Sequence, residues 1–458
     1  MPWRVRRSGA KGALHMTDFF FARSQMAMSL AFHIVFAALG IGMPLFMAIA
    51  EGMYLRTRQP VYLDLGKRWA RGTAIFFAVG AVSGTVLSFE LGLLWPGFME
   101  KAGPIIGLPF SLEGFAFFTE AIFIGVYLYG WNRLSPFLHW LSGLIVAVSG
   151  IFSGLFVVTA NAWMNSPSGF KIVDGKITDI DPVAAMLNQA SFHEVLHVTL
   201  AAFVATGFAV AAVHAFFLLR NPNSLFHRSA LGIALAAACI SIPLQILSGD
   251  FSARVVARLQ PAKLAAMEAH YRTQTGAPLL IGGIPHDETR TTDYAISLPC
   301  GLSLLLADNP NARVVGLEDF PQNNWPNVRI VHWSFDLMVA AGMAMLVLAV
   351  WSGWRWRQGR PLAGHPRLLR ALVAAGPLGF VAIEAGWVVT EAGRQPWIIY
   401  GLMRTEDAVT PMPWIVAPFV LFTGIYIFLA FIVFFLLRRQ FLERPGAVSE
   451  PSPNRTHA

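Results

Sequence analysis

The chain has 458 residues, of which 55% are hydrophobic and only 13% are charged, and its mean hydropathy is +0.55. A water-soluble domain carries roughly a quarter charged residues, so this composition excludes a soluble globular protein and indicates a membrane protein. The net charge of +8 could suggest a nucleic-acid partner. The basic residues instead lie in short stretches between apolar segments, which is a topology signal, and we expect no nucleic acid to bind.

Nine apolar segments are long enough to cross a membrane as helices. The predicted fold is therefore all-α, a polytopic membrane protein with nine transmembrane helices in a bundle. The first segment is too long for a signal peptide and is followed by further apolar segments. The nine segments lie near residues 26–52, 74–95, 111–130, 138–161, 193–219, 230–248, 332–352, 372–392 and 413–437.

Lysine and arginine are concentrated after the first and seventh segments and in the carboxyl-terminal tail. By the positive-inside rule the amino terminus is outside and the carboxyl terminus is cytoplasmic, although the basic residues before residue 12 argue the other way. The predicted divisions are an N-terminal extension with the start of the first helix (1–25), six helices (26–248), a long outer loop (249–331), three helices (332–437) and a cytoplasmic tail (438–458).

Ionisable residues inside apolar segments are costly and are therefore functional candidates. His33 lies well inside the first segment, where it is either a hydrogen-bonded packing residue or a ligand. Glu113 and Glu120 are nearly two helical turns apart, so both carboxylates face the same side of the third segment. They predict a proton relay, or one haem contact and one relay member. Glu90 lies near the outer end of its segment, and we expect it to be solvated.

The fifth segment begins with the string His193-Glu194-Val-Leu-His197, which fits the bare His-Glu-x-x-His pattern of zinc proteases. No third ligand in the metzincin form follows, which disfavours that interpretation. Met338 lies in an apolar helix, where methionine usually fills space. Its segment and that of His197 both enter from outside, so the two residues lie at similar depth and could bind one six-coordinate haem.

A second pair of carboxylates, Glu384 and Glu391, is also seven residues apart, and its helix ends near Gly393. Glu391 lies close to the outer surface and is expected to be solvated or structural. Magnesium or calcium would need oxygen ligands alone, whereas nitrogen, sulfur and carboxylate together suit haem. The two cysteines, Cys239 and Cys300, form no Cys-x-x-Cys-His motif, so any haem would be held non-covalently.

The strings EAGW at 384–387 and GRQPW at 393–397 resemble the signature of subunit I of cytochrome bd-type quinol oxidases. The similarity extends to Leu112-Glu113-Gly and to KLAAME at 263–268, and it covers nearly the whole chain. It implies a haem-binding bundle in the bacterial cytoplasmic (inner) membrane. It also implies a heteromer with a subunit II, with a small single-span subunit as a further candidate partner, and contact with membrane lipid.

The resemblance implies that His197 and Met338 are the axial ligands of low-spin haem b558. His33 and Glu384 would serve the two high-spin haems, b595 and d, or a b haem in place of haem d. Glu113 would lie beside haem d as a ligand or proton donor, and Glu120 would belong to the proton path.

The same resemblance places Lys263 and Glu268 in a quinol-binding loop, and Arg394 and Trp397 near the haem propionates. The outer loop is short, as in the branch that includes cyanide-insensitive oxidases. Asp336 stands where some members carry a basic residue two positions before the methionine.

The implied reaction is quinol:oxygen oxidoreduction. Quinol would be oxidised at the outer face, and electrons would pass through haem b558 to the high-spin pair. O2 would be reduced there to water with cytoplasmic protons, which generates a proton motive force. Two alternatives are a membrane b-haem electron-transfer subunit that does not reduce O2, and a proton-coupled transporter.

Overall fold

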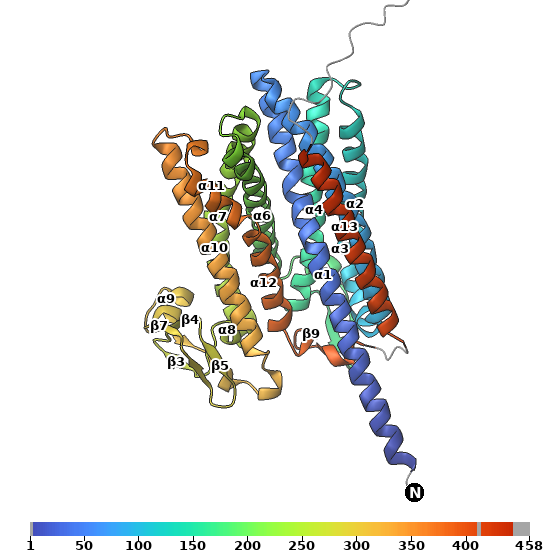
Figure 1. Ribbon diagram of the computed structural model, residues 1–458. Helices are drawn as coiled ribbons and strands as arrows, with labels where there is room; N and C mark the ends of the chain where they lie inside the picture. Colours follow the sequence, from blue (N-terminus) through green and yellow to red (C-terminus); the bar gives the residue numbers. More distant parts are fainter. Residues whose placement is uncertain (1–2, 410–413, 443–458) are drawn as a thin grey trace, which may run out of the picture.

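The computed structural model describes residues 3–409 and 414–442 (Figure 1). Within these residues, nine helical stretches are long and apolar enough to cross a membrane, which confirms the all-helical polytopic fold. The predicted tail at 438–458 lies mostly outside the described residues. The spanning elements are α1 (Trp3–Thr57), α2 (Pro60–Leu94), α3 (Pro96–Tyr129), α4 (Pro136–Asn165), α6 (Ser191–Arg220), α7 (Leu225–Leu259), α10 (Val328–Arg357), the pair α11 (Pro366–Ala375) and α12 (Leu378–Gly393), and α13 (Val416–Leu442).

Most helices extend beyond the apolar segments from which they were predicted, because polar and proline-containing ends continue the helix past the hydrocarbon. Helix α3 begins at Pro96 rather than near residue 111, and it contains Pro104 and Pro109. Proline suits the first turn of a helix, where its missing N–H has no intrahelical acceptor. The side chains of Ser224 and Asn327 accept backbone N–H groups at the starts of α7 and α10.

The helices form two groups that meet at α6. Helices α1 to α4 and α13 pack together on one side, and α7, α10, α11 and α12 gather around α6 on the other (Figure 1). Helix α6 also packs against α1 and α4, so it joins the two groups.

The eighth apolar segment, predicted as one helix near 372–392, is two helices with a break at Gly376-Pro377. Proline cannot donate to the preceding turn, which ends α11. The residues at and just after the break pack closely against α6. A Cβ on Gly379 would lie 2.4 Å from the Cα of Ala205 and one on Gly376 would lie 2.7 Å from the Cβ of Ala212, so both glycines press directly on α6.

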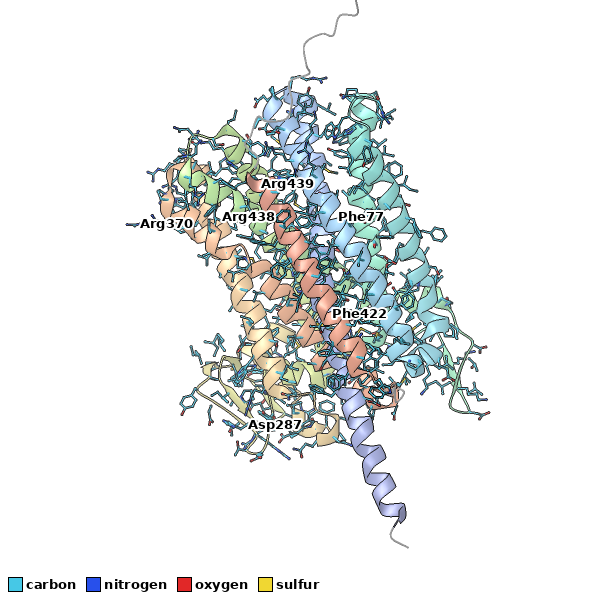
Figure 2. The ribbon with its side chains drawn as sticks, turned by 45° about the vertical axis from the view of Figure 1, so that its right-hand side comes forward. Phe77, Asp287, Arg370, Phe422, Arg438 and Arg439 are labelled. Carbon is cyan, nitrogen blue, oxygen red and sulfur yellow. The ribbon has the colours of Figure 1, made fainter. Side chains whose placement is uncertain are left out.

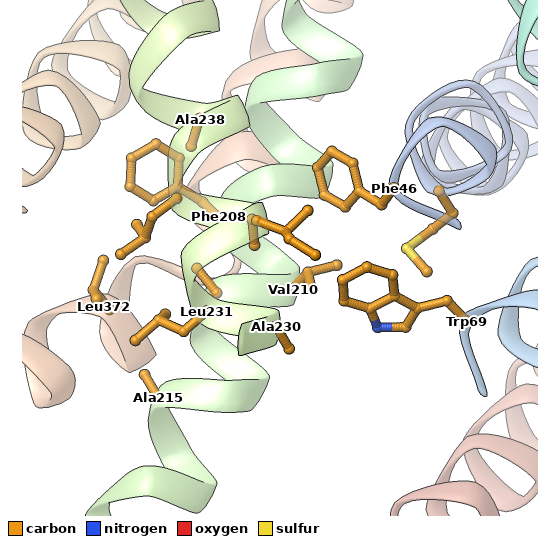
Figure 3. Close-up of a cluster of buried hydrophobic side chains, with 14 of the residues drawn as sticks. Phe46, Trp69, Phe208, Val210, Ala215, Ala230, Leu231, Ala238 and Leu372 are labelled. Carbon is orange, nitrogen blue, oxygen red and sulfur yellow. The ribbon is translucent and has the colours of Figure 1, made fainter. Parts of the chain in front are cut away.

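A close-packed apolar cluster fills the end of the bundle that lies away from the long loop (Figure 3). Phe46 of α1 and Trp69 of α2 meet Phe208 of α6 there, and small residues such as Ala230 and Ala238 let α7 approach. The predicted site residues lie toward the opposite end. The apolar cluster and the predicted site residues therefore occupy different parts of the bundle, and two buried polar pairs, His139–Glu51 and His214–His227, lie beside the cluster.

The predicted long loop between α7 and α10 is ordered. It holds α8 (Pro261–Met267), α9 (Gly301–Ala307) and short strand pairs, and small clusters of buried residues pack inside it. Helix α8 ends at Met267, and the φ of 47° at Ala269 prevents it from continuing. Arg254 of α7 donates to both carboxylate oxygens of Asp308, at 2.5 and 3.0 Å, and fastens α9. The strand pairs are β3 (Gln274–Thr275) with β8 (Arg313–Val314), β4 (Leu279–Ile281) with β7 (Ile296–Leu298), and β5 (Ile284–His286) with β6 (Thr291–Asp293).

The remaining short elements lie at the same end of the bundle as the long loop. A β-hairpin of β1 (Lys171–Val173) and β2 (Lys176–Thr178) and helix α5 (Pro182–Met186) connect α4 to α6. Strands β9 (Trp397–Ile399) and β10 (Met403–Arg404) follow α12. Figure 2 shows Asp287 of the long loop at one end of the molecule and Arg370, Arg438 and Arg439 toward the other.

Replacing Gly379 with alanine is expected to destabilise the protein, because the new methyl group would meet the backbone of α6 at Ala205. Overpacking of this kind costs about 1–3 kcal/mol. Gly342 of α10 is the matched control, since a Cβ there would meet nothing within 4 Å. Thermal unfolding of the purified protein should show a Tm lower by several degrees for Gly379→Ala and an unchanged or higher Tm for Gly342→Ala. Equal values for the two variants would contradict the close approach.

Candidate functional site

His33 of α1 is held by a serine on α2. Its Nδ1 lies 2.9 Å from the Oγ of Ser83, and that hydroxyl donates its proton to the carbonyl oxygen of Val79 at 2.8 Å. The imidazole Nδ1–H therefore donates to Ser83, and Nε2 keeps its lone pair. The ring lies against Gly84, where a Cβ would come within 3.1 Å of the His33 Cε1. The histidine is thus oriented as a metal-ligating imidazole is oriented by an outer hydrogen bond.

His197 of α6 has the same arrangement with α7. Its Nδ1 lies 2.9 Å from the Oγ of Ser248, whose proton goes to the carbonyl oxygen of Gln245 at 2.9 Å. The side-chain amide of Gln245 donates to the His197 Nε2 at 3.1 Å, so this nitrogen acts as an acceptor. Gly249 lies against the ring, and its Cβ would stand 3.5 Å from Cε1. The serine bonds therefore leave Nε2 without a proton in both predicted histidine ligands, and the His197 Nε2 is occupied by the Gln245 amide.

Met338 and Glu384 come from neighbouring helices, α10 and α12. The Met338 sulfur lies against Gly386, where a Cβ would be 3.1 Å away. Glu384 is two residues before that glycine, and its Oε1 is buried with no hydrogen-bond partner among the described residues. A buried carboxylate oxygen without a partner is costly in protein, which suits a ligand atom whose partner is a metal.

Glu113 and Glu120 both face α4, as the sequence predicts. The Oε1 of Glu113 accepts from the hydroxyl of Ser153 at 3.2 Å. The Glu120 carboxylate is 6% exposed and lies beside Gly150, whose Cβ would stand 3.5 Å from it. The same Cβ would come within 3.2 Å of the carbonyl oxygen of Gly40, so α1 and α4 also meet at this point. The two carboxylates form a short polar column between three helices.

Arg394 closes α12 and is 2% exposed. Its Nη2 donates to the Glu391 carboxylate at 2.6 Å, whereas Nε and Nη1 are buried without a partner in the described part of the chain. Glu391 also accepts from Asn161 at 2.7 Å, so it is structural, one of the two expectations for it. Two unpaired guanidinium donors fit a ligand carboxylate such as a haem propionate. Trp397 lies apart from them under the guanidinium of Arg404, with 5.1 Å between the Arg404 Cζ and the ring centroid.

Lys263 and Glu268 belong to the long loop, but neither lies on its surface. Lys263 is 5% exposed, and its ammonium donates to Gln260 at 2.8 Å and to Asn165 at 3.1 Å. Burial lowers the pKa of Lys263 to about 8. Glu268 is 2% exposed, and burial, followed by the charge of Asp336, raises its pKa to about 8. Both groups are therefore poised to change charge near neutral pH.

Glu90 was expected to be solvated, and this is wrong: it is 1% exposed and accepts from Gln25 at 2.9 Å and from Ser29 at 2.8 Å. It is buried because α1 extends past it and covers it. His193, of the zinc-like string, contacts Ser252 at 3.1 Å, and no group of three metal-binding side chains occurs in the described residues.

The serines that orient the two histidines were missed by the sequence reasoning. Each is followed by the glycine that lies against the ring, as Ser83-Gly84 and Ser248-Gly249. A Ser-Gly pair inside an apolar segment could not have identified them by itself, because four further pairs occur in the spans, as at Ser142-Gly143 and Ser352-Gly353. The network of Asn165, Gln260 and Glu194 around Lys263 was also missed, since it joins residues of three separate elements.

Oriented imidazoles, a thioether and unpartnered buried carboxylate and guanidinium groups define a membrane protein whose residues fit haem. Residues 21–445 match the family described as Cytochrome bd terminal oxidase subunit I. The chain therefore belongs to the subunit I family of cytochrome bd quinol oxidases, which are haem-carrying terminal oxidases.

Three similar proteins have been compared with the chain. It is 38% identical over 435 residues to a Bacillus subtilis (strain 168) protein provisionally named a cytochrome bd menaquinol oxidase subunit I, covering 94% of this chain and 98% of the relative. It is 32% identical over 409 residues to the cytochrome bd ubiquinol oxidase subunit 1 of the same organism, covering 86% and 87%. The solved bd oxidase of Geobacillus thermodenitrificans has a TM-score of 0.88 and 38% identity, covering 93% of this chain and 98% of that one.

Proposed function

We propose that the chain oxidises quinol at its long loop and holds three haems, with His197 and Met338 as the axial pair of low-spin haem b558. The observation that carries this proposal is the shared geometry of His33 and His197. Each donates Nδ1–H to a serine of a neighbouring helix, which leaves Nε2 unprotonated, and the Gln245 amide that donates to the His197 Nε2 would turn away when an iron binds there. His197 and Met338 would hold this haem, which would supply one-electron transfer when bound.

His33 and Glu384 would serve the two high-spin haems, b595 and d, or a b haem in place of haem d. The free Nε2 of His33 and the unpartnered Oε1 of Glu384 support this assignment. When bound, the haems supply one-electron carriers and, at an open iron position, the place where O2 is reduced to water. Arg394 would pair with a propionate through its two free donors.

Quinol oxidation would use the buried groups of the loop. Glu268, whose pKa is raised to about 8, would accept a proton from the quinol hydroxyl in its ionised form. Lys263 keeps its ammonium between Asn165 and Gln260, where it holds α8 against α4, and its stem lies against Gly393 of α12. The relatives are named for menaquinol and for ubiquinol, so we propose a membrane quinol as the electron donor.

Protons for O2 reduction would pass along Glu120 and Glu113. Both carboxylates lie in one column against α4, so a proton held at Glu120 can reach Glu113 within two helical turns of α3. Glu113, bonded to Ser153, would be a ligand or the final proton donor. Uptake on one side of the membrane and release on the other would generate a proton motive force without a pump.

The orientation we propose places the amino terminus and the long loop outside and the carboxyl terminus in the bacterial cytoplasm. The arginines that Figure 2 labels at the end opposite the loop support this arrangement. As a subunit I, the chain would work with a subunit II, and a small single-span subunit is a further candidate partner. Exposed apolar side chains on α3, α10 and α13 offer surfaces for such subunits and for lipid.

Replacing Ser248 with alanine is expected to weaken retention of haem b558, because the His197 Nδ1 loses the acceptor that fixes its orientation. Loss of such an outer partner lowers affinity about 10- to 100-fold. Ser252→Ala is the matched control, since Ser252 holds His193 one turn away. A pyridine haemochrome assay and a reduced-minus-oxidised spectrum should show less b558 in the first variant only. Equal haem in both would argue against His197 as the ligand.

Glu384→Ala is expected to remove a high-spin haem and with it O2 reduction, because the variant lacks the carboxylate that we propose as a ligand of that haem. The measurements are haem per polypeptide, the CO-binding difference spectrum of reduced membranes and oxygen consumption. Glu100→Ala, on an exposed part of α3, is the control. Normal O2 reduction by the Glu384→Ala variant would remove the central assignment of the proposal.

Quinol oxidation is expected to rise with pH through about 8 and to level off only well above that value. The pKa of Glu268 is raised to about 8, so at lower pH only a minor fraction of its carboxyl is ionised and able to accept a proton. Glu268→Gln should abolish this rise in kcat/KM, whereas Glu288→Gln, on the exposed turn of the loop, should retain it. A rise that persists in Glu268→Gln would assign the proton acceptor to another group.

A further inference from the structure

One buried histidine joins two separate parts of the long loop to α10. His332, in the second turn of α10, is 0% exposed. Its Nδ1 lies 2.7 Å from the carbonyl oxygen of Met267, the last residue of α8. Its Nε2 lies 3.1 Å from the carbonyl oxygen of Gly282, directly after β4. A single ring therefore binds the backbone of the loop at two points that are distant in sequence.

Asp336, one turn further along α10, completes the contact. Its Oδ2 accepts from the N–H of Gly282 at 2.9 Å and lies 3.4 Å from the His332 Nε2. Both backbone polar groups of Gly282 are thus bound by α10. Both ring nitrogens of His332 thus face backbone carbonyl oxygens, and the Asp336 carboxylate lies beside Nε2.

The loop backbone at this point has a shape that other residues would not easily adopt. Gly282 and Gly283 have φ values of 68° and 104°. A Cβ on Gly283 would come within 2.9 Å of Thr292, Ala295 and Asp293, so the turn is also closely covered on its other side. The exposed Trp333 donates to the carbonyl oxygen of Gly283 at 2.8 Å from outside. The turn therefore has one well-defined backbone conformation, which α10 can hold in place.

We propose that His332 and Asp336 are positioning residues for quinol oxidation, which hold the end of α8 and the Gly282-Gly283 turn against α10. The inference rests on the proposed role of the long loop in binding quinol. Glu268 directly follows Met267, so the His332 contact fixes where that carboxyl lies. Met338 is less than two turns further along the same helix, so the loop and the proposed axial ligand share one rigid support.

Limited trypsin cleavage of the whole oxidase complex tests the positioning without using quinol. Arg290 lies in the exposed turn between β5 and β6, and cutting there requires the hairpin to open. Removing two buried hydrogen bonds in His332→Ala should speed cleavage after Arg290 about tenfold or more. Trp333→Phe, which loses only the outer contact to Gly283, is the control and should change the rate less than about twofold.

Steady-state kinetics test the consequence for the substrate. His332→Ala should raise KM for quinol about tenfold, while kcat and the haem spectrum change little, because the site is displaced rather than removed. His332→Gln keeps a donor near the position of Nε2 and should recover part of both effects. Asp336→Asn keeps an acceptor for Gly282 but loses the charge, and it should fall between His332→Ala and the native protein. If His332→Ala does not accumulate, His332→Gln and Asp336→Asn carry the comparison with Trp333→Phe.

Cleavage rates and KM values in the His332 and Asp336 variants that match those of Trp333→Phe would overturn the inference. A fall in kcat with unchanged KM would also overturn it, since that result would assign these residues to chemistry or to haem binding. Failure of the proposed function looks different: the native complex would not oxidise quinol, whereas the cleavage rates would still separate the variants.

Discussion

A polar group inside hydrocarbon must find its partner within the protein, and this constraint organises the whole molecule. An unsatisfied donor or acceptor there costs several kcal/mol. The imidazoles of His33 and His197 meet the constraint through serines on adjacent helices, and the serine protons continue to backbone carbonyls. The same contact also decides which ring nitrogen carries the proton and which keeps its lone pair. The orientation of α2 relative to α1, and of α7 relative to α6, therefore determines which imidazole nitrogen can act as a ligand.

The division of the bundle into two halves follows from the same requirement. Apolar side chains and alanines fill most of the half around Phe46, Phe208 and Trp69, and the buried pairs His139–Glu51 and His214–His227 lie beside them. The other half contains the predicted site residues, whose carboxylates, imidazoles and guanidinium group lie where two or three helices meet. Glycine is used at these meeting points, as at Gly84, Gly150 and Gly386, because a larger residue would occupy the space beside the functional group.

The sequence was sufficient to predict the number of spans, the long loop and the common face of Glu113 and Glu120, since these depend on periodicity within one segment. It was not sufficient for features that depend on two segments. Glu90 was expected to be solvated, because nothing in its own segment shows that α1 covers it. The serine partners of the histidines depend on how neighbouring helices are rotated, which an apolar pattern does not specify. The break at Gly376-Pro377 was visible in the sequence, but it lay within an otherwise continuous apolar stretch.

The three attachments of the long loop have a consequence for how its length can vary during evolution. Arg254 of α7 binds the end of α9, Lys263 of α8 binds Asn165 of α4, and His332 of α10 binds both the end of α8 and the Gly282 turn. An added segment at any of these places would separate a charged or polar group from its partner. The β5–β6 turn around Asp287 and Arg290 is exposed and carries none of the three attachments. Extra residues are thermodynamically cheap at such a tip, so natural length differences should be concentrated there while the base of the loop stays constant.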